Sequence, residues 1–138
     1  MKALIDTCII IDILQQREPF CHAANDILHA VSDNKLTGVL TAKSLTDIHY
    51  IIRRSIHNET TVRKHLSTLF SLFAVADTCA ADCERALVSK MSDYEDAIMV
   101  ETAKRIAADC IVTRNLKDYA QADIPILSPE DCLAKLAK

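Results

Sequence analysis

Glycine is nearly absent from this chain: Gly38 is the only glycine among 138 residues, and there are three prolines. The P-loop, the dinucleotide-binding GxGxxG turn and the GxSxG turn of serine hydrolases each need several glycines. The sequence therefore argues against these three classes of protein. So few glycines and prolines also leave few hairpin turns, which argues against an all-β fold.

Tryptophan is absent and aromatic residues make up only 4% of the chain, whereas hydrophobic residues make up 50%. A chain this rich in aliphatic residues is not disordered, and it builds its core from Ile, Leu, Val and Ala. Its length fits one domain, residues 1–138, of a size that buries a substantial core.

Long apolar runs are also missing. No stretch approaches the roughly 20 residues of a membrane span, and Asp6 and Asp12 interrupt the apolar run near the start, so no signal peptide is predicted. We therefore expect a cytoplasmic protein with no membrane partner. The six cysteines form no CxxC pair, and their spacing does not suit a zinc ribbon or finger. Buried, reduced thiols are the favoured interpretation, and a zinc site is the alternative.

An excess of positive charge is lacking too. The net charge is −3, whereas proteins that bind nucleic acids usually carry a basic surface. The overall charge therefore argues mildly against nucleic acid, but a local basic rim would suffice to hold a substrate. The candidates for such a rim are Lys43, Arg53, Arg54, Arg63, Lys64, Lys90, Arg114 and Lys117.

Short apolar runs alternate with longer amphipathic ones along the chain. Strands are expected at residues 2–5, 38–41, 73–76, 110–113 and 124–127, and helices at 8–16, 19–32, 43–57, 59–70, 80–91, 94–108 and 129–136. This alternation predicts an α/β fold with parallel strands covered by helices. Because ligands bind beyond the carboxyl ends of such strands, acids that follow a strand are the first candidates for a site.

Three acids in the first half of the chain need an interpretation. Asp6 directly follows the first strand, where it is a site carboxylate, the N-cap of the next helix, or both. Asp47 lies in the helix after the second strand, four residues after Lys43, so an exposed ion pair is the favoured local interpretation. Asp12 is expected to face outward or to pack structurally on the first helix.

Asp96 is the most informative acid. The segment before it has the form of a capping box, with Ser92 as the cap and Glu95 reaching back to it. Asp96 then lies in the first turn, where the helix dipole favours a carboxylate, and it begins an apolar stripe that continues at Val100. No Lys or Arg stands three or four residues away. A carboxylate in that place needs a counter-charge, which a metal ion would supply.

Further polar residues surround the same elements. Asp93 is either a second site acid or an ordinary residue at the helix N-terminus. Asn115 and Asp118 follow the strand at 110–113, where Asn115 caps the next short helix, supplies an oxygen ligand, or donates to a metal-bound water. The histidines show no metal-ligand spacing, and a structural role is favoured even for His49, the nearest to the predicted site.

Several motifs occur in the order expected of PIN domains, and the sequence resembles that family over essentially its whole length. The motifs are Leu4-Ile5-Asp6-Thr7, Ser44-Leu45-Thr46-Asp47-Ile48, Asp93-Tyr94-Glu95-Asp96-Ala97, Ile111-Val112-Thr113-Arg114-Asn115 and the tail Ile124-Pro125-Ile126-Leu127-Ser128-Pro129-Glu130. The DxEDA and TRN motifs look most like those of the VapC-like toxin ribonucleases of bacterial toxin–antitoxin systems.

The resemblance implies a three-layer α/β/α sandwich around a parallel sheet of four or five strands, with a nuclease site for one or two divalent ions. Matched by position, Asp6, Asp47 and Asp96 are the acids of that site, and Asp47 stands where the family often has Glu. Asn115 stands where many members have a fourth Asp. This departure argues against tight binding of a second ion unless Asp118 compensates. Cys8 also replaces the Asn that commonly follows Asp-Thr.

The chemistry of the residues agrees with this resemblance. Clustered carboxylates repel one another unless a cation intervenes, and hard oxygen ligands favour Mg²⁺ or Mn²⁺ over Zn²⁺. We therefore predict a metal-dependent endoribonuclease in which Asp6 and Asp96 bind the ion directly and Asp47 binds it directly or through water.

The remaining candidates receive supporting roles. Asn115, with Asp93 or Asp118, is expected to position the nucleophile or a second ion. Thr7 and Thr113 are candidate hydrogen-bond partners of the ligands.

The resemblance to toxins further implies RNA as the substrate, an antitoxin protein as a partner and a homodimer. Two alternative functions remain. One is a protein-interaction module with weak catalysis, which the acidic balance and Asn115 suggest. The other is a metal-dependent phosphoesterase that acts on small substrates.

Overall fold

The structure is a computed structural model that describes residues 1–138, and its centre is a parallel sheet of five strands in the order β3-β2-β1-β4-β5. The strands are β1 (Lys2–Ile5), β2 (Thr37–Thr41), β3 (Ala74–Ala76), β4 (Cys110–Val112) and β5 (Ile126–Leu127). Leu4 of the central strand β1 pairs with Val39 on one side and Ile111 on the other. The predicted parallel sheet is confirmed.

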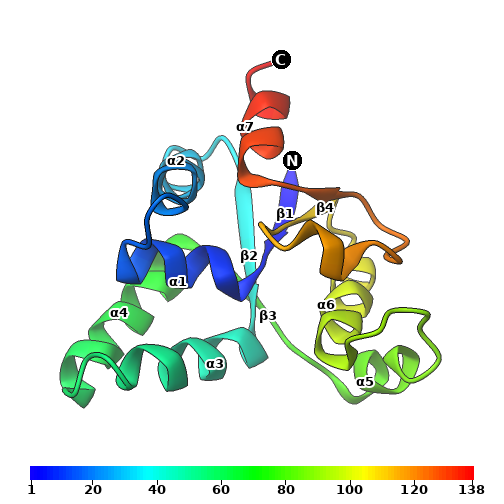
Figure 1. Cartoon of the computed structure of the whole chain (residues 1–138), viewed down its shortest axis with the longest axis horizontal. Coiled ribbons are helices and arrows are strands. Elements are labelled where there is room, and N and C mark those ends of the chain that lie inside the picture. The colour runs from blue at the N-terminus through cyan, green and yellow to red at the C-terminus, as the bar shows by residue number, and fades with distance from the viewer.

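Helices cover both faces of this sheet (Figure 1). They are α1 (Thr7–Gln15), α2 (Cys21–Ser32), α3 (Ala42–Arg53), α4 (Glu59–Leu72), α5 (Ala80–Ala86), α6 (Tyr94–Arg105) and α7 (Pro129–Leu136), with a short 3₁₀ helix, η1 (Leu116–Tyr119). Helices α1, α2, α3, α4 and α7 share one core with the sheet, and α5 and α6 share the other. The predicted three-layer α/β/α sandwich is therefore confirmed.

Strand β1 is buried on both faces because side chains alternate across a strand. Ala3 and Ile5 point into the larger core and Leu4 into the smaller one, and none of the three is exposed to solvent. Such burial explains why the strand is a continuous apolar run. It also fixes the position at which the chain leaves the sheet, which is Asp6.

Gly38, the only glycine, lies where the side chains of Phe73 and Val31 pack directly onto the backbone of β2. A Cβ atom at this position would lie 2.8 Å from both the Phe73 ring and the Val31 side chain. The absence of a side chain therefore lets α2 and the residue that ends α4 pack closely against β2.

Three helices end well before the sequence predicts. The predicted helix 43–57 ends at Arg53, where the next two amides bond carbonyls three residues earlier instead of four. The predicted helix 80–91 ends at Ala86, because the next three amides bond carbonyls three residues earlier instead of four. The predicted helix 94–108 ends at Arg105. Ala107 adopts a left-handed φ of 53°, and the Ala108 amide returns to the Ala103 carbonyl at 2.9 Å. Alanine gives no local signal for such a turn.

The carboxyl ends of the strands lie at the edge of the sheet opposite the two chain termini (Figure 1). The N-terminus and helix α7 lie together at the other end of the molecule. None of the helices is both long enough and apolar enough to cross a bilayer.

Candidate active site

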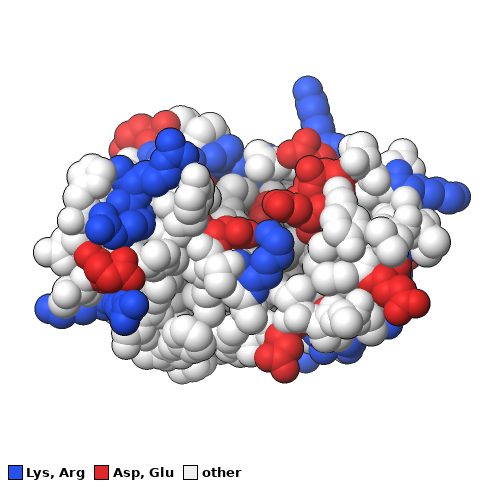
Figure 2. Space-filling view, turned by 90° about the horizontal axis from the view of Figure 1, so that it is seen from below, with Lys and Arg blue, Asp and Glu red and all other residues white.

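A cleft of about 560 Å³ opens where β1, β2 and β4 end and where α6 begins. This edge faces the viewer in Figure 2, which shows acidic side chains gathered near the middle of the surface with basic side chains beside them. The lining residues are Asp6, Thr7, Cys8, Ile11, Arg17, Lys43, Ser44, Asp47, Tyr50, Ile51, Glu95, Asp96, Met99, Arg114 and Asn115. The cleft thus contains four of the predicted site residues.

Asp6 occupies the N-cap position of α1, but its side chain makes no capping hydrogen bond. Its backbone amide donates to the Val112 carbonyl at 2.9 Å, which ties the residue to the neighbouring strand β4. The Thr113 hydroxyl donates to its carboxylate at 2.7 Å. Burial raises the pKa of Asp6, although this hydrogen bond lowers it. The carboxylate is therefore held in place and is not used by the helix.

Cys8 lies beside Asp6, and its thiol donates to the Asp6 carboxylate over 3.5 Å. Burial, with the nearby Asp6 charge, raises the pKa of the Cys8 thiol to about 12. Cys8 is consequently a neutral donor at physiological pH rather than a thiolate. The predicted role of Thr113 as a partner of Asp6 agrees with the structure, whereas the Thr7 hydroxyl donates to Ser44 at 3.1 Å instead.

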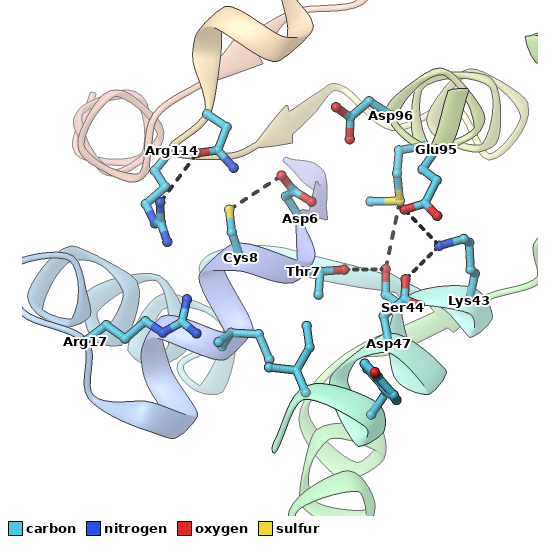
Figure 3. A pocket seen from close by; sticks show the side chains of 15 residues that line it. Asp6, Thr7, Cys8, Arg17, Lys43, Ser44, Asp47, Glu95, Asp96 and Arg114 are labelled. Atoms are coloured by element: carbon cyan, nitrogen blue, oxygen red, sulfur yellow. Dashed lines mark hydrogen bonds and ion pairs between the residues drawn. The ribbon is translucent and has the colours of Figure 1, made fainter. Parts of the chain in front are cut away.

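Asp96 approaches the cleft from the first turn of α6, and Figure 3 shows the Asp96 and Asp6 side chains beside the same open space. Burial, followed by the charges of Asp93, Asp6 and Asp118, raises the pKa of Asp96 to about 6. The only hydrogen bond to its carboxylate comes from the Tyr119 hydroxyl at 3.3 Å. No basic residue neutralises Asp96, as its sequence position predicted.

The cap of α6 is Asp93, not Ser92, so the predicted capping box is wrong. The Asp93 carboxylate accepts the Asp96 amide at 2.9 Å, and Asp93 has the extended backbone of an N-cap residue. Aspartate caps helices as well as serine does, so the helix begins one residue later than the motif suggests. Glu95 does not reach back to the cap: its carboxylate lies 3.6 Å from the Lys43 ammonium group.

Asp47 is paired, as its local sequence predicted. The Lys43 ammonium group lies 2.7 Å from its carboxylate, one helical turn away on α3. Lys43 thus links Asp47 to Glu95 across the cleft (Figure 3). Among Asp, Glu, His and Cys side chains, no three donor atoms of the cleft lie within 4.8 Å of one another. The cleft acids therefore line a common space without forming a tight cluster of three.

Asn115 lines the cleft next to Arg114, whose guanidinium group donates to the Asn115 side-chain oxygen over 3.4 Å. Arg114 also donates twice to Asp12, over 2.7 and 3.2 Å. Asp12 is fully buried, so it does not face outward, and its structural role is to hold Arg114. The Arg114 guanidinium group lies 4.3 Å above the Phe20 ring, which also restricts its position.

The other candidates lie outside the cleft. Asp93 and Asp118 are exposed, and the charges of both raise the pKa of Asp96. Asp93 also contacts Asp96 through the cap hydrogen bond to its amide. His49 lies 2.9 Å from a carboxylate oxygen of Glu59. Of the eight basic residues predicted for a rim, only Lys43 and Arg114 line the cleft.

A model of the PIN domain family matches residues 2–117 of this chain. The chain belongs to the PIN-domain family. PIN domains are nucleases that generally use divalent metal ions. The prediction that this chain is a nuclease is therefore confirmed. None of the curated proteins matches the chain at a significant level.

Solved structures similar to this PIN domain extend over nearly its whole length. The VapBC2 complex of Rickettsia felis, bound to a DNA fragment from its promoter, matches with a TM-score of 0.69 and 16% identity over 93% of this chain and 98% of the other. A toxin–antitoxin complex from Klebsiella pneumoniae matches with a TM-score of 0.67 and 26% identity over 92% and 97%. FitAcB from Neisseria gonorrhoeae matches with a TM-score of 0.66 and 17% identity over 94% and 99%.

Sequence reasoning missed three polar residues of this PIN-domain cleft. Tyr50 lies three residues after Asp47 on α3, so helical periodicity placed both on one face and was the available signal. Glu95 was assigned to a capping box instead of to the cleft. Arg17 follows the end of α1, and its position depends on a turn that no motif marks.

Proposed function

We propose that this PIN domain is an Mg²⁺- or Mn²⁺-dependent endoribonuclease whose site is the cleft at the carboxyl ends of β1, β2 and β4. The main support for this proposal is that Asp6 and Asp96, from distant parts of the chain, border the same cleft and neither forms an ion pair with a basic side chain. Burial and neighbouring acids raise the pKa of Asp96 to about 6, which is the electrostatic signature of a site that favours a cation.

The residues of the cleft fit a hard divalent cation. Asp6 and Asp96 offer carboxylate oxygens, the ligands that Mg²⁺ and Mn²⁺ prefer. Asp47 would bind the cation directly or through water, and the cation would compete with Lys43 for its carboxylate. Asn115, together with Asp93 or Asp118, would position the attacking water. When bound, the cation would lower the pKa of a water molecule and stabilise charge on the phosphodiester.

The chain's own basic side chains would hold the substrate. Arg17, Lys43 and Arg114 line the cleft and offer donors to phosphate oxygens. Arg114 is suited to this role because Asp12 and Phe20 fix its orientation before the substrate arrives. Tyr50 is 64% exposed at the cleft and offers a ring on which an unpaired base can stack.

The direct test is cleavage of RNA by purified Asp6→Asn and Asp96→Asn variants with Mg²⁺ or Mn²⁺. Each variant is expected to lose activity by roughly 100-fold or more, because each loses a charge that the cation requires. Asp26→Asn, on the exposed face of α2, is the matched control and should cleave as the wild type does. Full activity in either cleft variant would overturn the assignment.

We further propose that the protein is the toxin of a toxin–antitoxin pair and acts as a homodimer. The likeness to the Klebsiella pneumoniae complex at 26% identity supports this proposal. The antitoxin would occupy the cleft through a basic side chain that pairs with Asp6 or Asp96. Induced expression should arrest growth for the wild type and not for Asp96→Asn, and light scattering should give twice the chain mass of 15.3 kDa.

A protein-interaction module with weak catalysis is the second candidate, because Lys43 neutralises Asp47 and Asn115 carries no charge. Calorimetry with Mn²⁺ separates the two functions. Saturable binding that Asp96→Asn abolishes supports the nuclease, whereas no binding at millimolar Mn²⁺ supports the module.

A further inference from the structure

A second group of metal-ligating side chains lies outside the cleft, at the start of α2. Glu18, Cys21 and His22 bring an oxygen, a sulfur and a nitrogen to within 4.8 Å of one another. They form the only such group of three or more Asp, Glu, His and Cys side chains in the chain. The proposed nuclease function uses none of these residues.

The three side chains converge where the turn at residues 17–20 leads into α2. The Cys21 amide donates to the Arg17 carbonyl at 2.7 Å, and Phe20 has helical backbone angles of φ −71° and ψ −27°. This turn places the Glu18 side chain beside those of Cys21 and His22, which occupy the first two positions of α2. The turn and the start of α2 thus set the spacing of the three donors.

The three donors differ in their exposure to solvent. Cys21 is only 2% exposed, whereas the side chains of Glu18 and His22 are 67% and 73% exposed. The His22 Nε2 atom lies 2.7 Å from a Glu18 carboxylate oxygen. A solvent-exposed Glu–His pair alone would be an ordinary surface ion pair of little energetic value. The buried thiol beneath it adds a soft ligand that such a pair lacks.

The donor set selects a class of ion different from that of the cleft. Thiolate sulfur with imidazole nitrogen and one carboxylate is a ligand set of Zn²⁺ and similar transition metals, and Mg²⁺ does not favour sulfur. We propose that Glu18, Cys21 and His22 form a binding site for Zn²⁺ or a similar divalent transition-metal ion, with solvent in the remaining coordination position. On binding, the Cys21 thiol releases its proton to solvent as the metal–sulfur bond forms, and the direct Glu18–His22 contact separates.

The bound ion would restrain residues 17–22, a segment that includes Arg17 and Phe20 beside the cleft. Arg17 lines the cleft, and Phe20 lies under Arg114, which also lines it. Figure 3 shows Arg17 and Arg114 on the same side of this cleft. The site therefore lies where an ion can influence substrate binding without contacting the substrate.

The test is titration of the purified full-length chain with Co²⁺, a spectroscopic substitute for Zn²⁺, followed through thiolate-to-cobalt charge-transfer absorption. We expect saturation at one ion per chain and displacement by Zn²⁺. The absorption should disappear in Cys21→Ser, and the affinity should fall at least tenfold in His22→Ala and in Glu18→Gln.

Two controls separate this site from other ligands. Asp96→Asn should keep the absorption, because the cleft acids contribute no thiolate. His29→Ala, an exposed histidine on the same helix, should bind Co²⁺ as the wild type does. This readout does not depend on ribonuclease activity, so the site and the proposed nuclease function stand or fall separately.

Absence of the charge-transfer band in the wild type, or an unchanged band in Cys21→Ser, would overturn the proposal. Circular dichroism reports whether the buried Cys21→Ser substitution disturbs folding. If it does, the exposed substitutions His22→Ala and Glu18→Gln decide, and wild-type affinity in both would equally overturn the proposal.

Discussion

Asp96 is the cleft residue whose ionisation is most clearly opposed by its surroundings. It is half-buried, it receives a single hydrogen bond from Tyr119, and three other carboxylates raise its pKa. Without a cation, the folded protein therefore pays a cost whenever Asp96 is ionised. A cation removes that cost, which links the stability of the protein to the chemistry proposed for its cleft.

The pH dependence of stability is the first prediction at this scale. The pKa of Asp96 is raised from 3.8 to about 6, so the folded state binds its proton more tightly than the unfolded state does. This contribution to stability is fully present below pH 3.8 and is lost as the pH rises through about 6. Metal-free Asp96→Asn should therefore be more stable than the wild type at pH 7, by about 1–2 kcal/mol once solvent screening is allowed for.

Urea unfolding of both proteins in chelator at pH 3.5 and pH 7 provides the measurement. The gap between the two free energies of unfolding should shrink at the lower pH. An equal gap at both pH values would show that the substitution acts through packing and not through the charge.

Asn115 gives the second prediction at the residue scale. Asn115→Asp places a further carboxylate in the cleft, where many PIN domains have Asp, so the affinity for Mn²⁺ should rise about tenfold. The same substitution should lower the stability of the metal-free protein. Calorimetry with Mn²⁺ measures the affinity, and Asn25→Asp on α2 is the control. An unchanged affinity would mean that Arg114 neutralises the new charge.

At the scale of secondary-structure elements, the cleft depends on contacts between parts of the chain that are far apart. Asp12 on α1 holds Arg114 after β4, and Thr113 holds Asp6. The local sequence predicted the strand ends and the unpaired Asp96, because strand periodicity and helix position are local properties. It did not predict the Asp12–Arg114 pair, because 102 residues separate the two. The cap at Asp93 was also missed, since Ser92 and Asp93 are equally suitable residues.

The Asp12–Arg114 pair gives a prediction about two elements. Arg114→Met should destabilise the protein by about 3–5 kcal/mol, because it leaves the fully buried Asp12 charge without a partner. The double variant Asp12→Leu with Arg114→Met should recover most of this loss, and it should still cleave RNA poorly because the cleft lacks the guanidinium group. Chemical denaturation and cleavage assays measure the two effects. A single variant within 1 kcal/mol of the wild type would contradict the role given to the pair.

At the scale of the whole molecule, five parallel strands bring residues from all parts of the sequence to one edge. The alternation of short apolar and long amphipathic segments was enough to predict this arrangement, because parallel strands need helical crossovers. The exact helix ends were not predictable, since Ala107 takes a left-handed conformation that tertiary packing imposes. The sequence therefore allowed a better prediction of the fold than of the side-chain contacts in the cleft.

Cation binding should be visible in the stability of the whole molecule. Mn²⁺ at about 100 times its dissociation constant should stabilise the wild type by about 2.7 kcal/mol, which raises the midpoint of thermal unfolding by several degrees. The double variant Asp6→Asn with Asp96→Asn should show no such shift. Differential scanning calorimetry with and without Mn²⁺ makes the comparison, and equal shifts in both proteins would place the ion elsewhere.

The two chain termini lie at the end of the molecule opposite the cleft (Figure 1). An affinity tag, a fluorophore or a tether to a glass surface can therefore be attached at either terminus while the acidic opening stays directed toward solution. Immobilised molecules would present a uniform, unobstructed orientation to labelled RNA, so the arrival and departure of single substrates could be counted with the native cleft intact.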